Sequence, residues 1–241
     1  MKNRLDTELP RRGLARSRND AQEKIHAGLV SVNKKVITKM STLIQDTDII
    51  NIRETGNDFV GRGGKKLEGA IKEWNIDFKN KIIVDVGSST GGFTEVALLN
   101  GAKKVYAVDV GSDQLDKKIQ DDARVIVMEK IDIRKVQLKE KMDVAVIDVS
   151  FISLEKILTH VKGLLVPRGI IIALIKPQFE VGKTIATKYK GIITSEIERQ
   201  RSLKKVSEYA QSIGLSILGT MESPITGTDG NVEYFAYMKN G

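Results

Sequence analysis

The sequence contains no cysteine, and its 241 residues include only two histidines, His26 and His160. Without cysteine the chain can form no disulfide, no thiolate zinc site and no cysteine nucleophile. Two histidines also make a histidine metal site improbable. We therefore expect no bound metal and a chemistry that uses carboxylates, lysines and hydroxyls.

Long apolar runs are also absent. The longest one, Ile170 to Ile175, has six residues, whereas a helix that crosses a bilayer needs about 20. The basic start of the chain, Met1 to Arg4, leads into no apolar signal core. These absences predict a cytoplasmic protein with no membrane partner, and they argue against a membrane-damaging cytolysin.

Positive charge, by contrast, is abundant and unevenly placed. The formal net charge is +8, and residues 2–39 hold ten Lys/Arg against four acids. A basic segment of this kind indicates a polyanionic partner such as a nucleic acid. A solvated surface would account for the charge equally well, so charge alone does not identify the partner.

Residues 1–60 are predicted to form a small α+β module. Leu5 and Leu9 have the spacing of a short helix, residues 30–36 have the pattern of two strands joined by a turn, and residues 48–52 favour a further strand. A linker is expected at about 56–63, followed by a second domain at 61–241 that starts with a helix.

The larger domain alternates apolar runs with amphipathic stretches, which is typical of a parallel sheet covered by helices on both faces. Its last two apolar segments follow each other without a helix, and they predict an antiparallel hairpin at the sheet edge. The fold class is therefore expected to be α/β, with a doubly wound, seven-stranded sheet that resembles the Rossmann-like methyltransferase sheet. The strands are expected at 82–86, 104–109, 124–128, 142–148, 170–175, 215–221 and 232–238, and the helices at 92–100, 112–119, 153–164 and 194–213.

A glycine-rich turn follows the first of these strands, with the sequence D-V-G-S-S-T-G-G-F at residues 85–93. Its spacing fits neither the dinucleotide fingerprint nor the phosphate-binding loop. The turn, with an acid ending the next strand, instead resembles sites for S-adenosylmethionine, although such glycines can also make a plain tight turn. The candidate cofactor contacts are Asp85, Gly87, Ser88, Ser89, Thr90, Gly91, Gly92, Phe93, Asp109 and Asp132.

Two more polar residues follow buried strands. Asp148 ends the fourth strand and Lys176 ends the fifth, so both are expected at the edge where ligands bind in doubly wound sheets. A purely structural lysine–carboxylate pair is the alternative. Glu233 lies in the last predicted strand, and by itself it reads as a solvent-facing strand residue.

Six phrases occur in one order along the chain: F-V-G-R-G-G-K-K-L-E-G-A, D-V-G-S-S-T-G-G-F-T, V-Y-A-V-D-V-G, I-D-V-S-F-I-S-L, K-P-Q-F-E-V-G and S-P-I-x-G-x-x-G-N-V-E-Y-F. Together they resemble the TlyA family, also called hemolysin A, in which an S4-type RNA-binding domain precedes an FtsJ-like methyltransferase domain. The resemblance implies methyl transfer from S-adenosylmethionine to the ribose 2′-hydroxyl of cytidine in ribosomal RNA. By motif position, the catalytic tetrad of FtsJ-like enzymes falls on Lys66, Asp148, Lys176 and Glu233.

The order R-L-D…G-L-A-x-S-R-x-x-A-Q-x-x-I-x-x-G-L-V-x-V-N makes residues 3–53 resemble the S4-type RNA-binding domain. This resemblance implies that the basic side chains of the module face ribosomal RNA, free or in ribosomal subunits. Arginine suits this role because its planar fork can donate two hydrogen bonds to one phosphate. The residues concerned are Arg4, Arg11, Arg12, Arg16, Arg18, Lys24, Lys34 and Lys35.

The chain departs from the family pattern in three places. Residues 57–60 read N-D-F-V, where the family has a basic residue and then Trp or Tyr before Val. Lys65 adds a charge beside Lys66. The segment at 181–194, after K-P-Q-F-E, is longer than the usual glycine-rich one and carries lysines, so it could grip RNA or be only a loop.

Other methyl acceptors fit less well. Methylation of pyrimidine carbon-5 uses a cysteine nucleophile, and amino-nitrogen methylation uses a D/N-P-P-Y/F motif where this chain has Asp148-Val149-Ser150-Phe151. We assign Lys176 to positioning and deprotonating the hydroxyl, either as a neutral base or as a cation that stabilises the alkoxide. A non-catalytic RNA-binding ribosome factor remains the alternative function.

Overall fold

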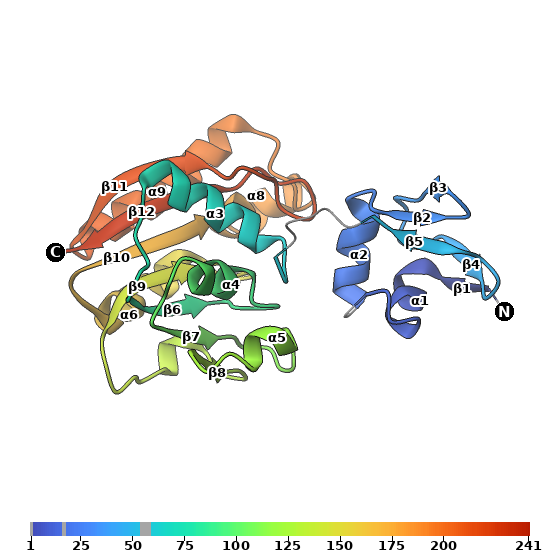
Figure 1. The fold of residues 1–241 in the computed structure, drawn as a ribbon. Coiled ribbons are helices and arrows are strands. Elements are labelled where there is room, and N and C mark those ends of the chain that lie inside the picture. The colour runs from blue at the N-terminus through green and yellow to red at the C-terminus, as the bar shows by residue number, and fades with distance from the viewer. Residues whose placement is uncertain (1, 16–17, 54–58) are drawn as a thin grey trace. The chain divides into compact units, whose positions relative to one another are not determined.

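The computed structural model describes residues 2–15, 18–53 and 59–241. The chain divides into two compact units, Met1–Asp58 and Phe59–Gly241 (Figure 1). Of the predicted linker at 56–63, residues 56–58 lie outside the described ranges. The two units are described separately.

The first unit is an α+β module built around a small apolar core. Leu5, Leu9, Ile25, Val30 and Ile44 form this core and are almost fully buried. β2 lies between β3 and β5 in a three-stranded antiparallel sheet, and β1 pairs with β4. The elements are β1 (Lys2–Arg4), α1 (Leu5–Arg11), α2 (Arg18–His26), β2 (Val30–Val32), β3 (Lys35–Val36), β4 (Leu43–Gln45) and β5 (Ile50–Ile52).

The second unit is built on one seven-stranded sheet of order β11-β12-β10-β9-β6-β7-β8. The predicted fold class is confirmed. Six strands run in one direction, and β12 runs antiparallel between β10 and β11. The strands are β6 (Ile82–Val86), β7 (Lys104–Val108), β8 (Val125–Met128), β9 (Met142–Ile147), β10 (Leu165–Ile175), β11 (Leu215–Glu222) and β12 (Tyr234–Asn240).

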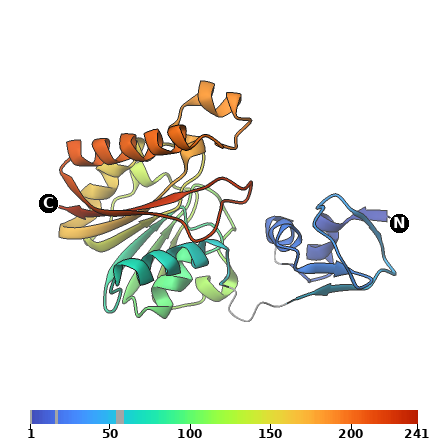
Figure 2. The ribbon, with the colours of Figure 1, turned by 90° about the horizontal axis from the view of Figure 1, so that it is seen from above.

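Helices cover both faces of this sheet (Figure 2). On one face, Leu67 of α3 and Phe93 of α4 pack into one core; on the other, Leu158 of α6 and Val206 of α9 pack into a second. The helical elements are α3 (Gly63–Trp74), α4 (Gly92–Leu99), α5 (Lys117–Gln120), η1 (Ile133–Lys135), η2 (Leu154–Lys156), α6 (Leu158–Leu164), α7 (Pro177–Glu180), α8 (Lys183–Lys188) and α9 (Glu196–Ser212). None of the helices in the described ranges has the length and apolar character of a membrane span.

Two expected helices were wrong in extent. The helix expected at 112–119 begins only at Lys117, because Asp113 has a φ of 56° and the Asp116 side chain caps the helix by accepting from Lys118 N–H. The helix expected at 153–164 is split into η2 and α6, and Ile157 between them has a non-helical φ of −122°. Both changes shorten helices that leave the carboxyl edge of the sheet.

The antiparallel strand β12 determines which residues meet at that edge. Ile175, the last residue of β10, pairs with Tyr234, the first residue of β12. Lys176, which directly follows β10, therefore lies close to Glu233, which directly precedes β12. Glu233 precedes β12 and is only 3% exposed, so its interpretation as a solvent-facing strand residue was wrong.

Candidate active site

The turn between β6 and α4 brings the chain close to the end of β9. Gly87 has a φ of +84°, and a Cβ added there would lie 2.4 Å from the carbonyl oxygen of Asp148. Only glycine therefore fits this position without moving the backbone. Gly91 also has a left-handed φ, of +97°, and it is the N-cap residue from which α4 begins.

A cavity of about 380 Å³ lies at the carboxyl ends of β6, β7 and β9. This volume falls within the usual range for small-molecule sites. Apolar side chains such as Val108 and Ile133 form part of its wall. The sequence-predicted residues that line it are Gly87, Ser89, Asp109, Asp132 and Asp148.

Two aspartates in this wall are held by their own turns. Asp109 accepts hydrogen bonds from the backbone N–H groups of Ser89 (2.8 Å) and Gly111 (2.7 Å). Asp132 accepts from the backbone and side chain of Arg134, and these hydrogen bonds lower the pKa of Asp132 to about 2. Asp132 is thus an ionised carboxylate at neutral pH.

Asp85 lies beneath the turn and is fully buried. Its Oδ2 accepts a 2.6 Å hydrogen bond from the Thr94 hydroxyl, whereas its Oδ1 has no partner among the described residues. Burial raises the pKa of Asp85 to about 7, and the negative charge of Asp148 acts in the same direction. Asp85 is not among the residues that line the cavity, so within this structure it supports the turn through Thr94.

The other predicted cofactor contacts face elsewhere. Phe93 lies in the core with its ring 6.2 Å from that of Phe235, measured between centroids. Ser88 is buried. Thr90 and Gly92 lie against Gly61 in the segment that leads into α3, so this part of the turn supports α3 rather than lining the cavity.

The four residues predicted as the catalytic tetrad form two ion pairs. Nζ of Lys176 lies 2.6 Å from Oδ1 of Asp148, and it donates a 2.9 Å hydrogen bond to the hydroxyl of Ser150. Nζ of Lys66 donates a 2.6 Å hydrogen bond to Oε2 of Glu233, and these two side chains are 9% and 3% exposed.

The first turn of α3 connects the two pairs. A Cβ added at Gly63 would lie 3.5 Å from Oδ2 of Asp148, and Lys66 follows one turn later on the same helix. The Lys66–Glu233 pair is therefore the more deeply buried of the two pairs. The side chains of Lys176 and Asp148 are 12% and 18% exposed. Of the four residues predicted as the tetrad, Asp148 lines the cavity.

An aromatic residue that was not predicted from the sequence lies beside this pair. Phe151 is 91% exposed and has a φ of 65°, which is unusual for a bulky residue. Its ring centroid lies 5.2 Å from that of Phe179, which follows Lys176 on α7. The aromatic residue three positions after Asp148 was the available signal.

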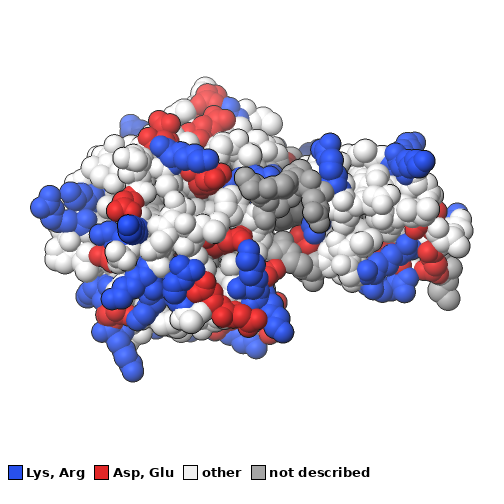
Figure 3. Space-filling view, viewed as in Figure 1, with Lys and Arg blue, Asp and Glu red and all other residues white. Residues whose placement is uncertain are grey.

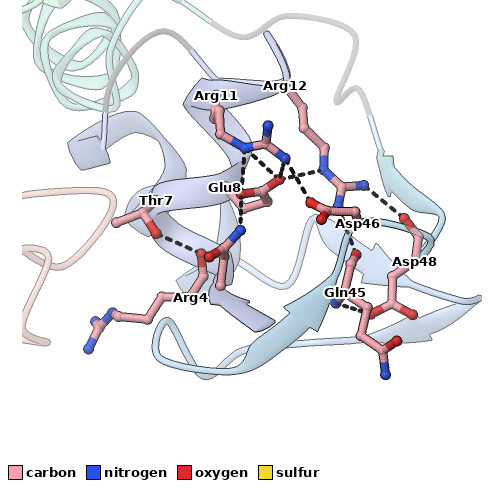
Figure 4. Close-up of polar contacts among 9 residues, drawn as sticks. Arg4, Thr7, Glu8, Arg11, Arg12, Gln45, Asp46 and Asp48 are labelled. Carbon is pink, nitrogen blue, oxygen red and sulfur yellow. Dashed lines mark hydrogen bonds and ion pairs between the residues drawn. The ribbon is translucent and has the colours of Figure 1, made fainter. Parts of the chain in front are cut away.

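The basic residues of the first unit differ in how many acidic side chains and backbone carbonyls they already bind. Arg11 pairs with Glu8 and Asp46, while Arg12 pairs with Glu8 and donates to the carbonyls of Gln45 and Asp48 (Figure 4). Arg12 is only 20% exposed. Arg12 therefore stabilises the turn that leads into β5.

A second group of ion pairs forms around buried acids. Arg4 and Arg18 both bind Asp6, and hydrogen bonds from Arg4 and then Gln22 and Arg18 hold the pKa of Asp6 below its usual range. Lys24 pairs with Asp20 at 2.9 Å. Arg16 lies outside the described residues.

Lys34 and Lys35 are exposed at the β2–β3 turn, and neither pairs with an acid within the described ranges. In the view of Figure 3, basic and acidic side chains are interspersed over both units. The free lysines are therefore distinguished by their lack of acidic partners rather than by a continuous basic surface.

Residues 59–240 match the family of FtsJ-like methyltransferases, and residues 3–50 match the S4 domain. The chain is 39% identical over 240 residues to the 16S/23S rRNA (cytidine-2′-O)-methyltransferase TlyA of Mycobacterium tuberculosis, covering 98% of this chain and 89% of that protein. It is 40% identical to Hemolysin A of Brachyspira hyodysenteriae, covering 97% and 98%.

A solved structure from Streptococcus thermophilus, named as a hemolysin, superposes with a TM-score of 0.79 at 38% identity and covers 99% of this chain and 88% of that one. The sequence likeness extends through both units in each of these proteins. The chain therefore belongs to the TlyA family of FtsJ-like methyltransferases with an N-terminal S4 domain.

Proposed function

We propose that this protein transfers a methyl group from S-adenosylmethionine to the ribose 2′-hydroxyl of a cytidine in ribosomal RNA, in the cytoplasm. The observation that carries the proposal is the Lys176–Asp148 pair at the mouth of the cavity, backed by the buried Lys66–Glu233 pair. The relative from Mycobacterium tuberculosis, which is named for this reaction, supports the same substrate.

The cavity and its turn are the proposed cofactor site. Asp109 is placed to bind ribose hydroxyls, and Asp132 lies where a charged acceptor can meet the adenine. Gly87 allows close approach of the cofactor to the backbone, and the buried Asp85 supports the turn through its hydrogen bond with Thr94. The cofactor supplies an electrophilic methyl group on a sulfonium; the protein supplies its orientation.

Lys176 is the proposed contact to the acceptor hydroxyl. A ribose hydroxyl is a weak nucleophile, so it must be oriented for in-line attack and lose its proton near the transition state. Asp148 and Ser150 fix the position of Nζ. A neutral amine there accepts the proton, and a charged one stabilises the developing alkoxide.

Phe151 is the proposed stacking surface for the acceptor base. Its exposed ring lies beside Asp148 and is braced by Phe179. Aromatic side chains bind unstacked RNA bases in this way. A base held on Phe151 brings its own ribose towards Lys176.

The first unit is the proposed RNA-binding module. Lys34 and Lys35, which have no acidic partner among the residues that the structure describes, are available to bind phosphate. Arg4, Arg11 and Arg18 keep additional N–H donors beyond their ion pairs, because a guanidinium carries five. Arg12 acts chiefly within the module.

The test is transfer of tritiated methyl groups from S-adenosylmethionine into unmodified ribosomal subunits and free rRNA. Wild type is expected to label the RNA. Lys176→Ala is expected to lose about 10²–10⁴-fold in kcat and to retain cofactor binding by calorimetry. Lys79→Ala, at the opposite edge of the sheet, is the matched control.

Absence of labelling by wild type in every RNA would overturn the proposal. Retained RNA binding in that case would favour the non-catalytic ribosome factor. Full activity of Lys176→Ala would remove Lys176 from the chemistry while leaving the reaction in place.

A further inference from the structure

We propose that residues 181–194, here called the α8 arm, bind the phosphate backbone of the substrate RNA beside the target nucleotide. The inference rests on the proposed RNA substrate, and it adds a second RNA contact within the methyltransferase unit itself. The arm follows α7 and includes α8 (Lys183–Lys188).

The composition of the arm is one-sided. It carries Lys183, Lys188 and Lys190 and has no Asp or Glu. All three lysines are exposed, and no acidic side chain in the described ranges pairs with them. Some lysines elsewhere in this unit, such as Lys104 and Lys118, pair with acids, so the arm is distinguished by holding, within eight positions, three lysines without such a partner among the described residues. The charge of the arm is therefore available to a partner.

Core packing does not account for α8. None of its residues is buried, so the helix contributes no side chain to the cores of the domain. Nζ of Lys188 lies 5.5 Å from the ring centroid of the neighbouring Tyr189. A cation beside a half-buried aromatic ring is a common element of single-stranded nucleic-acid sites.

Both ends of the arm are attached to segments that carry residues of the proposed tetrad. The N-terminal end of the arm follows α7, which begins directly after Lys176. At the C-terminal end of the arm, the N–H of the buried Ile193 donates a 2.8 Å hydrogen bond to Oδ1 of Asn231. Nδ2 of Asn231 in turn donates a 2.8 Å hydrogen bond to the carbonyl of Gly191. Asn231 is itself 2% exposed and lies two residues before Glu233.

These tethers place the arm at the rim of the candidate active site. Figure 1 shows α8 beyond the tip of β10, and Figure 2 shows the segment projecting past the end of α9. An RNA strand that delivers a ribose to Lys176 must pass this rim. Three unpaired ammonium groups there match its phosphates better than they match an apolar or cationic partner.

The test compares two triple variants of the full chain. One is Lys183→Gln/Lys188→Gln/Lys190→Gln in the arm. The matched control, Lys79→Gln/Lys103→Gln/Lys139→Gln, removes the same charge from exposed lysines that precede β6, β7 and β9 at the opposite sheet edge. The probes are unmodified ribosomal subunits and free rRNA, with S-adenosylmethionine binding measured separately.

The arm variant is expected to raise the KM for RNA at least about tenfold, with kcat and cofactor affinity nearly unchanged. Its slope of log affinity against log salt should fall by about 2, since each neutralised phosphate contributes about 0.7 for single strands. The control should change KM less than about twofold. Replacing the same three arm lysines with arginine should restore binding.

Equal effects of the two triple variants, or an unchanged KM and salt slope in the arm variant, would overturn the proposal. If wild type labels no RNA, the proposed reaction fails, yet the binding and salt measurements still decide the role of the arm. As a second variant, Asn231→Ala should loosen the backbone of the arm, speed tryptic cleavage after Lys183, Lys188 and Lys190, and raise the KM for RNA. Unchanged cleavage and KM in that variant would contradict the tether.

Discussion

The carboxylate of Glu180 accepts a 2.6 Å hydrogen bond from the hydroxyl of Ser153, which joins α7 to the start of η2. The same buried carboxylate accepts a 2.8 Å hydrogen bond from the N–H of Leu154. Because α7 follows Lys176 and η2 follows the loop that begins at Asp148, this contact fixes the spacing of the two segments that carry the ion pair. Glu180 is thus a positioning residue.

Replacing Glu180 should affect both stability and rate. Glu180→Ala leaves the Leu154 N–H without an acceptor and should lower the free energy of unfolding by about 1–3 kcal/mol. It should also lower kcat more than it raises KM. Glu180→Gln keeps an acceptor and should recover most of the rate. Urea denaturation and methyl-transfer kinetics measure both effects.

The control is Glu155→Ala, which removes a partly exposed partner of Lys205 (3.0 Å apart) and should cost under about 1 kcal/mol. A Glu180→Ala protein that is destabilised but keeps the wild-type kcat would show a purely structural role.

The Lys66–Glu233 pair should show strong coupling in a double-mutant cycle. Lys66→Met leaves the buried carboxylate of Glu233 uncompensated, at a cost of about 3–5 kcal/mol of unfolding free energy. The double variant Lys66→Met/Glu233→Leu should be more stable than Lys66→Met alone. Additive losses in urea denaturation would contradict a directly coupled pair, and methyl transfer should be lost in every variant of the cycle.

Asp85 makes stability depend on pH. Its pKa is raised by burial from 3.8 to about 7, so in this interval the unfolded chain ionises while the folded protein keeps the proton. The contribution of Asp85 is complete below pH 4 and is lost as pH rises towards 7, by up to about 1.4 kcal/mol per pH unit.

Comparison of wild type with Asp85→Asn isolates this effect. The stability of wild type relative to the variant should fall between pH 4 and 7 and level off above pH 7, as measured by urea denaturation of the cofactor-free protein. A pH-independent difference between the two proteins would show that Asp85 does not titrate in this range.

Phe151→Ala should separate RNA binding from stability. The ring is 91% exposed, so the free energy of unfolding should change by less than about 0.5 kcal/mol. Loss of one stacked base costs about 1–3 kcal/mol, which corresponds to a KM for RNA about 5–150-fold higher. Phe151→Tyr should behave as wild type, and Leu218→Ala, an exposed apolar residue of β11, is the control. An unchanged KM in Phe151→Ala would contradict stacking.

The sheet could be predicted from sequence because buried parallel strands are continuous apolar runs, and the edge hairpin because no helix separates its two runs. The position of Asp148 and Lys176 after such runs indicated that they would meet, and they lie 2.6 Å apart. Helix extents were less predictable, because the Asp116 cap and the break at Ile157 are local details that periodicity does not reveal.

Contacts between distant segments explain most of what the sequence did not reveal. Lys66 and Glu233 were assigned only through the family resemblance, since their pairing requires the register of β12. The tether at Asn231 and the Glu180–Ser153 bond join residues far apart in the chain. Charge counting likewise identified the arginines of the first unit but not the acids that already bind Arg4, Arg11 and Arg12.

The Lys66–Glu233 hydrogen bond joins residues 167 positions apart. One partner precedes the first strand of the large sheet and the other precedes its last, so the contact forms only after β12 has taken its place beside β10. A folding intermediate limited to β6–β9 would already contain the walls of the cavity but not this pair. Recovery of catalysis during refolding should therefore lag behind recovery of cofactor binding, which makes activity a reporter of complete folding.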